Sequence, residues 1–184
     1  MKWMIASDIH GSARWCEAML AAWRAQGAPR LVLLGDLLYH GPRNDLPDGY
    51  APKRVIELLN AVAPLLLCVR GNCEAEVDQM VLRFPVMADY AVLADGERLI
   101  YCTHGHVHNA DNPPPLPAGS ALLCGHTHIP GLRRCGDFTY ANPGSVAIPK
   151  NGTPHSYAVL ENGAMTWYGL ESGEAFMREP LFDA

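Results

Sequence analysis

Five short segments of this chain place metal-binding side chains beside a glycine. They are DIH at 8–10, GD at 35–36, GNCE at 71–74, THGH at 103–106 and GHTH at 125–128. Any one of them arises readily by chance. Together they bring imidazole, carboxylate and carboxamide groups, the ligand types that hold hard-to-borderline divalent metals. The combination predicts a metal site.

The number of donors predicts more than one ion. Seven side chains are candidate ligands: Asp8, His10, Asp36, Asn72, His104, His126 and His128. Because one divalent ion takes about four to six ligands, we expect two ions, roughly 3.5 to 4 Å apart and bridged by an anion. Asp36 stands between the two ligand groups in sequence order. Such a pair supplies a bridging hydroxide at neutral pH and clamps phosphate oxygens, so hydrolysis of a phosphate ester is the expected reaction.

Each segment follows an apolar run that reads as a buried strand, and the first half of the chain predicts a βαβαβ pattern. Strands are expected at 2–7, 30–34 and 65–69, and helices at 12–27, 52–62 and 74–84. Ligands in open α/β sheets bind at the carboxyl ends of strands, where these segments fall. Gly35, Gly71, Gly105 and Gly125 are expected to let the backbone turn sharply near the ions.

The second half changes to short strands joined by tight turns. Paired strands are expected at 90–94 and 98–102, at 132–135 and 138–142, and at 157–161 and 164–169. The proline-rich segment at 111–120 reads as a surface loop, so residues 1–184 are expected to form a single domain.

Composition narrows the class of protein. With 49% hydrophobic residues the chain can bury a substantial core, and its net charge of −5 argues against a surface that binds long nucleic acid. The opening residues do not resemble a signal peptide, and no apolar run approaches bilayer-spanning length, so a cytoplasmic protein with no membrane partner is expected. The six cysteines form no CxxC pair, and no disulfide framework is predicted.

In this order, DIH, GDLLYHG, GNCE, THGH and GHTHIP resemble the signature blocks of the calcineurin-like metallophosphoesterases. HGPRN, LPDGYAP and NPGSV extend the likeness to the bacterial YfcE-type phosphodiesterases. The resemblance implies an α/β sandwich of two mixed β-sheets flanked by helices and activity on phosphodiesters. It also implies a dinuclear centre, most often with Mn²⁺ and with Zn²⁺, Fe²⁺, Ni²⁺ or Co²⁺ as alternatives. One ion would take Asp8, His10, Asp36 and His128, and the other Asp36, Asn72, His104 and His126.

Cys73 departs from the commonest pattern of that superfamily, in which a histidine follows the asparagine and assists the leaving group. A thiol can neither become a cation nor donate a proton as imidazolium does, so the substitution favours monoanionic diesters with good leaving groups. Cys73, Asn72 and His104 are the catalytic candidates.

Other polar residues leave alternatives open. Arg43, Asn44 and His106 are candidate substrate contacts, although a loop cap or a solvated histidine explains them nearly as well. His40 is equally ambiguous, and Glu74 is interpreted as a carboxylate that orients its neighbours.

A metal-dependent phosphodiesterase for small organic diesters is the leading hypothesis, with a homo-oligomer as an open possibility. The alternatives are a nuclease or phosphomonoesterase of the same superfamily, or a non-catalytic scaffold on the same fold.

Overall fold

The structure is a computed structural model that describes residues 2–182. One sheet contains β1 (Lys2–Ala6), β2 (Leu31–Leu33), β3 (Leu66–Cys68), β9 (Ser156–Glu161), β10 (Ala164–Gly169) and β11 (Ala175–Pro180). A second sheet contains β4 (Ala91–Asp95), β5 (Arg98–Cys102), β6 (Ser120–Leu123), β7 (Gly131–Cys135) and β8 (Phe138–Asn142). The helices are α1 (Ala13–Gln26), α2 (Pro52–Asn60) and α3 (Glu76–Val81), with a 3₁₀ turn η1 (Ala63–Leu65).

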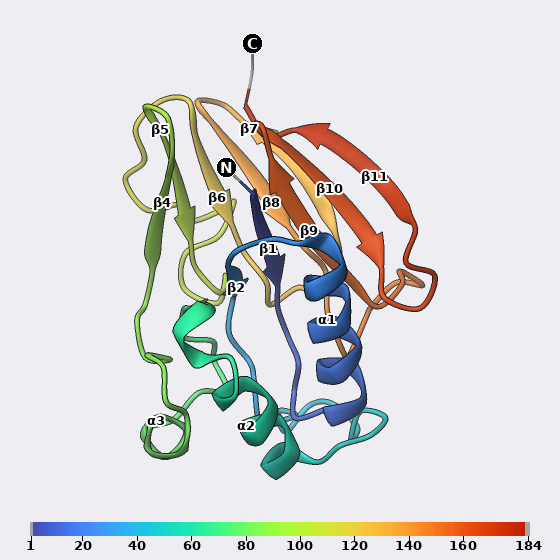
Figure 1. The fold of residues 1–184 in the computed structure, drawn as a ribbon. Helices are drawn as coiled ribbons and strands as arrows, with labels where there is room; N and C mark the ends of the chain where they lie inside the picture. The colour runs from blue at the N-terminus through green and yellow to red at the C-terminus, as the bar shows by residue number, and fades with distance from the viewer. Residues whose placement is uncertain (1, 183–184) are drawn as a thin grey trace.

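Both sheets are mixed. The first has the strand order β11-β10-β9-β1-β2-β3, with β1, β2 and β3 parallel and the C-terminal strands antiparallel. The second has the order β4-β5-β6-β8-β7, with β5, β6 and β8 parallel. In Figure 1 the sheets form two layers, with α1 and α2 lying over the first. The predicted fold class, two mixed β-sheets flanked by helices, is confirmed.

Alternating side chains on the central strands build two separate cores. Ile5 and Val32 point toward the second sheet and pack with residues such as Ile100 and Trp167. Their neighbours along β1 and β2 point the other way, toward the helices, and pack against α1 and α2. A strand that is buried on both faces reads as a continuous apolar run, which is why these segments were recognisable in the sequence.

Helix α1 begins and ends as its sequence predicts. The Ser12 side chain accepts a hydrogen bond from the Trp15 backbone N–H at 3.2 Å, and Gly27 adopts a left-handed conformation with φ of 63°. Pro52 occupies the first turn of α2. These residues determine where α1 begins and ends and where α2 begins.

The third helix is shorter than the predicted range of 74–84. Glu74 lies outside it because its buried carboxylate binds backbone N–H groups of the loop after β2. At Leu82 the backbone becomes extended, which ends the helix. Strands β6 and β11 were not delimited in the sequence, and β11 is largely exposed, so it lacks a clear apolar pattern. Among residues 2–182, no helix combines the length and the apolar character that a membrane crossing requires.

Candidate active site

The five polar segments meet at one end of the molecule. They follow β1, β2, β3, β5 and β6, and within each sheet these strands run parallel. The arrowheads of β1 and β6 point toward the lower part of Figure 1. Because the two sheets pack face to face, loops from both sheets come together there, and they bring the predicted ligands into two clusters joined by Asp36.

The first cluster contains Asp8, His10 and His128. Asp8 Oδ1 lies 3.5 Å from His10 Nε2 and 3.2 Å from His128 Nε2, and the two nitrogens are 3.4 Å apart. All three residues are at most 3% exposed. Asp8 Oδ1 is buried without a hydrogen bond of good geometry. Burial alone would raise the pKa of Asp8, but its interactions with His10 and His128 hold that pKa well below the usual range.

The second cluster contains Asn72, His104 and His126. His104 Nε2 lies 3.1 Å from Asn72 Oδ1 and 3.2 Å from His126 Nδ1. His104 is buried, His126 is partly exposed, and Asn72 is exposed. Two members of this cluster are therefore more exposed to solvent than any member of the first.

Asp36 lies between the clusters. Its Oδ2 is 3.7 Å from His10 Nε2 in the first and 3.4 Å from His104 Nε2 in the second. The other oxygen, Oδ1, accepts a hydrogen bond from the Cys73 backbone N–H at 2.9 Å. Asp36 is only 2% exposed, so one buried carboxylate faces both groups of donors.

Three of the four candidate ligand histidines are oriented by main-chain carbonyls. In each of them Nδ1 bonds a carbonyl oxygen: His10 with Tyr39 O at 2.8 Å, His104 with Leu34 O at 2.6 Å, and His128 with Ile148 O at 2.6 Å. Because a carbonyl only accepts, Nδ1 carries the proton and Nε2 faces the cluster with its lone pair when the ring is neutral. A second hydrogen bond of this kind is typical of metal-binding histidine.

The backbone at these ligands is strained. Five of the predicted ligands have positive φ angles: Asp8 (61°), His10 (46°), Asp36 (56°), His126 (66°) and His128 (63°). Left-handed conformations cost of order 1–3 kcal/mol each at residues other than glycine and concentrate at functional sites. Among the other non-glycine residues of 2–182, only Asn151 and Asn162 share this conformation.

Two glycines make room for the carboxylates. A Cβ atom at Gly71 would overlap Asp36 Oδ1, and one at Gly125 would overlap Ser7 Oγ and lie 2.8 Å from Asp8 Oδ2. Neither position tolerates a side chain while the carboxylates keep their places. At these two glycines the backbone therefore lies close against the carboxylates of Asp36 and Asp8.

Glu74 ties the loops after β2 and β3 together. Its Oε2 accepts hydrogen bonds from the backbone N–H groups of Asp36 (2.9 Å) and Gly71 (2.5 Å), and its Oε1 accepts one from Leu37 (2.7 Å). Burial and the Asp36 charge raise the pKa of Glu74 to about 7, although the three N–H groups oppose the shift. The carboxylate thus orients two segments that carry predicted ligands, which agrees with the interpretation of Glu74 as an orienting residue.

Cys73 sits beside the clusters as a neutral thiol. The Asn72 Nδ2 group donates to Cys73 Sγ at 3.3 Å, and the side chain is partly buried. Burial, together with the nearby Asp36 carboxylate, raises the pKa of Cys73 far above its ordinary value. In the metal-free protein the thiol is therefore protonated at neutral pH.

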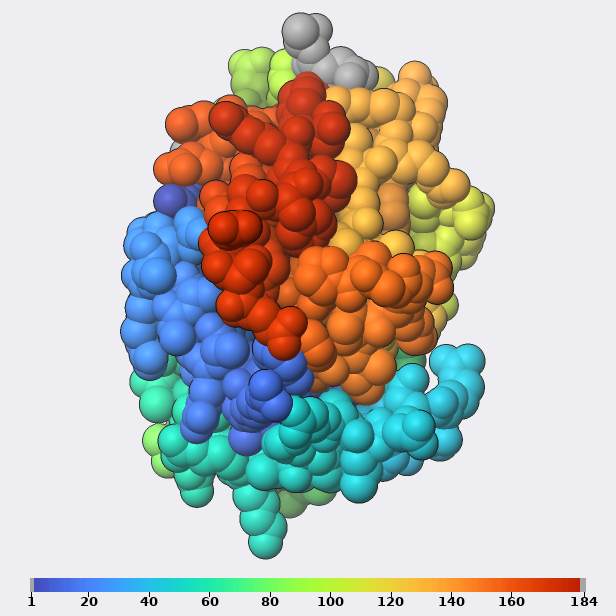
Figure 2. Space-filling view, turned by 90° about the vertical axis from the view of Figure 1, so that its right-hand side faces the viewer, coloured from blue at the N-terminus to red at the C-terminus, as the bar shows by residue number. Residues whose placement is uncertain are grey.

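A cavity of about 480 Å³, called here the metal-side cavity, opens over both clusters. Its lining includes His10, Asp36, Asn72 and Cys73, together with Arg43, Asn44, Thr127 and Lys150. In Figure 2 the loop around residues 40–50 (cyan) lies directly below the orange segment that follows β8. Arg43 and Lys150 place two cations at this opening. Lys150 was missed in the sequence, where nothing but its position shortly after NPGSV marks it.

The remaining candidates occupy different places. Asn44 lines the cavity, but its Nδ2 also donates to His40 O at 2.8 Å, as a loop cap would. The exposed ring of His106 does not line the metal-side cavity; it lies 5.4 Å from the His104 ring and 6.2 Å from the His126 ring. The ring of His40 contacts Tyr39 and Tyr50 edge-on instead.

Comparison with known proteins identifies the family. Residues 1–164 match the calcineurin-like phosphoesterase superfamily domain. The chain is 50% identical over 171 residues to phosphodiesterase YfcE of Escherichia coli K12, which covers 92% of each chain. It is 33% identical over 175 residues, 90% of this chain and 88% of the relative, to the probable metallophosphoesterase YsnB of Bacillus subtilis strain 168.

A solved structure agrees with these relatives. The structure of YfcE, a phosphoesterase from E. coli, superposes with a TM-score of 0.95 at 44% identity and covers 98% of this chain and 100% of that one. The chain therefore belongs to the calcineurin-like phosphoesterase superfamily and is a hydrolytic phosphoesterase.

Proposed function

We propose that this chain is a metal-dependent phosphodiesterase that hydrolyses small organic phosphodiesters at a centre of two divalent ions. The observation that carries the proposal is the position of Asp36, whose Oδ2 lies within 3.7 Å of histidine nitrogens from both clusters. The 50% identity to a protein named as a phosphodiesterase supports diesters as the substrate class.

One ion would be held by Asp8, His10, Asp36 and His128, and the other by Asp36, Asn72, His104 and His126. The donors fit such ions in two ways. Asp8 Oδ1 is a buried carboxylate oxygen that lacks a hydrogen bond, and several histidine nitrogens face one another and the carboxylates at 3.2–3.7 Å. Nitrogen and oxygen donors of this kind suit Mn²⁺, which we propose as the working metal.

When bound, the ion pair would supply an activated bridging hydroxide and positive charge for the phosphate. The chain's own side chains do the rest. Arg43 and Lys150 attract the anionic substrate into the metal-side cavity. Asp36, which faces both clusters, fixes their position relative to each other. Cys73 adds no positive charge and donates no proton readily, so a monoanionic diester with a good leaving group fits better than a dianionic monoester.

The test is an assay of purified, metal-stripped protein with bis(4-nitrophenyl) phosphate. We expect Mn²⁺ to restore hydrolysis and EDTA to abolish it, with activity on 4-nitrophenyl phosphate at least tenfold lower. Asp48→Asn, a change at an exposed carboxylate that pairs with Arg14, serves as the control and should behave like wild type. Full activity after exhaustive chelation would contradict the proposal. A preference for the monoester would favour the phosphomonoesterase alternative, and no turnover with bound metal would favour a scaffold.

A single domain over residues 1–184, a cytoplasmic location and a homo-oligomer stay predictions of the sequence.

A further inference from the structure

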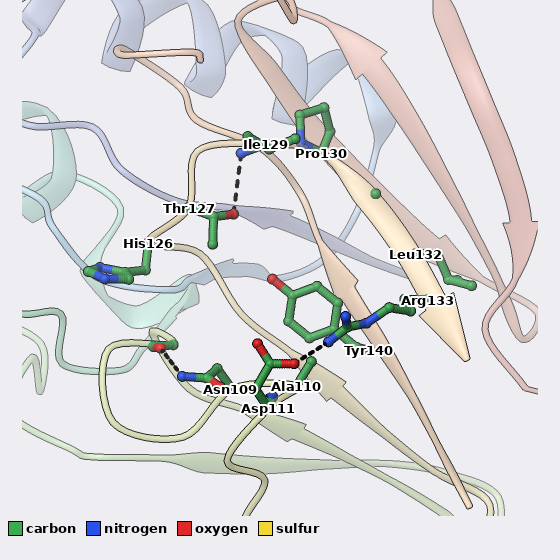
Figure 3. A pocket seen from close by; sticks show the side chains of 12 residues that line it. Asn109, Ala110, Asp111, His126, Thr127, Ile129, Pro130, Leu132, Arg133 and Tyr140 are labelled. Carbon is green, nitrogen blue, oxygen red and sulfur yellow. Dashed lines mark hydrogen bonds and ion pairs between the residues drawn. The ribbon is translucent and has the colours of Figure 1, made fainter. Parts of the chain in front are cut away.

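A second cavity of about 440 Å³ lies beside the metal-side cavity. This side cavity is formed by β7, β8 and the loop at 105–111, and its walls include Asn109, Asp111, Ile129, Leu132, Arg133 and Tyr140. Figure 3 shows Tyr140 near its centre, with Arg133 and Asp111 on one side of the ring and His126 and Thr127 on the other. The volume falls within the range of about 300 to 1,000 Å³ that is typical of small-molecule pockets.

The two cavities meet at the candidate active site. His126 and Thr127 line both of them. A ligand centred on the clusters can therefore extend past these two residues into the side cavity. The two ester oxygens of a tetrahedral phosphodiester point in different directions, so its two organic arms require two separate spaces.

The walls of the side cavity suit an uncharged, planar group. Ile129 and Leu132 supply apolar surface, and the Arg133 guanidinium lies 6.0 Å from the centre of the Tyr140 ring. A flat ring between such surfaces gains both apolar contact and a cation–π interaction. Arg133 is already paired with Asp111 at 2.9 Å, so the cavity offers no uncompensated cation from this residue to a second phosphate.

The side cavity is built before a ligand arrives. Asn109 Oδ1 accepts backbone hydrogen bonds from Asp111 and Asn112, and Asn109 Nδ2 donates to Gly105 O at 3.2 Å. The exposed Arg133–Asp111 pair also links this loop to β7. A preformed wall lowers the entropy lost on binding, which favours a binding function for the cavity.

We propose that the side cavity binds the organic arm that stays on phosphorus during hydrolysis, and that it selects an arm with an aromatic or similarly planar apolar group. The inference rests on the proposed phosphodiesterase function. The arm that leaves is placed in the metal-side cavity because Cys73 and Arg43 line that cavity and not the side cavity. The side cavity thus sets specificity for the retained arm.

The experiment uses two diesters with the same leaving group, phenyl 4-nitrophenyl phosphate and methyl 4-nitrophenyl phosphate, with Mn²⁺-loaded protein. Their kcat/KM ratio isolates the retained arm. We expect Ala110→Trp, which fills the side cavity, to lower the phenyl-to-methyl ratio by about tenfold or more. Arg133→Ala, which removes the guanidinium from an exposed position, should lower the ratio by about threefold.

Matched controls exist for both variants. Ala118→Trp adds the same bulk to an exposed loop position away from the cavity. Arg98→Ala removes a similar contact between a guanidinium and a ring, with Phe182, outside the cavity. Neither control should change the ratio.

Three outcomes separate the possibilities. A selective loss of the phenyl substrate in Ala110→Trp and Arg133→Ala supports the inference. A common loss of both substrates, or an unchanged ratio in well-folded variants, overturns it while leaving the phosphodiesterase function in place. Failure of the wild-type protein to hydrolyse either diester with Mn²⁺ overturns the function and the inference together.

Discussion

The two ligand clusters differ in depth. Asp8, His10 and His128 are at most 3% exposed. In the other cluster Asn72 is exposed and His126 is partly exposed, although residues of both clusters line the metal-side cavity. The deep cluster is thus suited to holding an ion rigidly, and the open cluster to holding an ion that also meets substrate. Asp36 is the residue through which one cluster is expected to affect the other.

Removal of the Asp36 charge should impair metal binding at both clusters at once. We expect Asp36→Asn to lower kcat/KM for bis(4-nitrophenyl) phosphate by about 10³-fold, because the charge that serves both ions is lost. Its carboxamide can still accept the Cys73 N–H hydrogen bond, so the fold should survive. Metal content by mass spectrometry and steady-state kinetics provide the measurement, with Asp48→Asn as the control. Two tightly held ions and a near-normal rate would refute the shared-carboxylate account.

Substitution of Glu74 should weaken metal binding at the clusters without changing a predicted ligand. Glu74→Gln keeps the size of the side chain, but an amide NH₂ cannot accept hydrogen bonds from the backbone N–H groups. We expect Mn²⁺ affinity to fall by about 10- to 100-fold and the free energy of unfolding to fall by about 1–3 kcal/mol. Glu76→Gln, at an exposed position two residues further on, is the matched control. Equal Mn²⁺ dissociation constants in the two variants would show that Glu74 does not position the site.

The pH dependence of metal binding tests the open cluster through His104. Burial lowers the pKa of His104 in the metal-free protein, but the Asp36 hydrogen bond and the nearby carboxylates outweigh it and raise that pKa to about 9. A ligand imidazole must be neutral, so binding below pH 9 displaces a proton. Mn²⁺ affinity should therefore rise about tenfold per pH unit between pH 7 and 8, as measured by calorimetry. His106→Gln should show the same slope, and a flat profile in the wild type would contradict the prediction.

The smallest expected effect concerns selectivity at Cys73. Cys73→His introduces a group that can be protonated near the phosphate, which favours a dianion and a poor leaving group. We expect the monoester-to-diester ratio of kcat/KM to rise roughly three- to tenfold, less than the 10² to 10⁴ of a well-positioned general acid. Cys73→Ala controls for loss of the thiol. If the nitrophenyl diester, the matching monoester and an alkyl diester all change by one factor in Cys73→His, residue 73 does not set selectivity.

Much of the fold was predictable because its central strands are buried on both faces and end in recognisable turns. The segments at 2–7, 30–34 and 65–69 contain β1, β2 and β3, and the three predicted hairpins contain observed antiparallel pairs. Exposed β11 carries no comparable pattern. The start of α3 depends on a tertiary contact of Glu74, which local propensity does not encode.

The candidate site was also predictable only in part. Its candidate ligands follow strands directly, so the carboxyl ends of parallel strands bring them together. Their division into two groups came from the resemblance to the calcineurin-like metallophosphoesterases. Lys150, Arg133 and Tyr140 reach the cavities from the C-terminal half, and no local motif connects them with the ligand segments. Cavity walls depend on how loops from two sheets pack, which a single sequence does not reveal by spacing.

The central claim is that two ions share Asp36, and anomalous X-ray scattering from crystals grown with Mn²⁺ tests it most directly. The account predicts two anomalous peaks roughly 3.5 to 4 Å apart, with the Asp36 carboxylate within coordination distance of both. One peak should lie at Asp8, His10 and His128, and the other at Asn72, His104 and His126. A single peak at full metal loading, or a second peak whose ligands exclude Asp36, would contradict it.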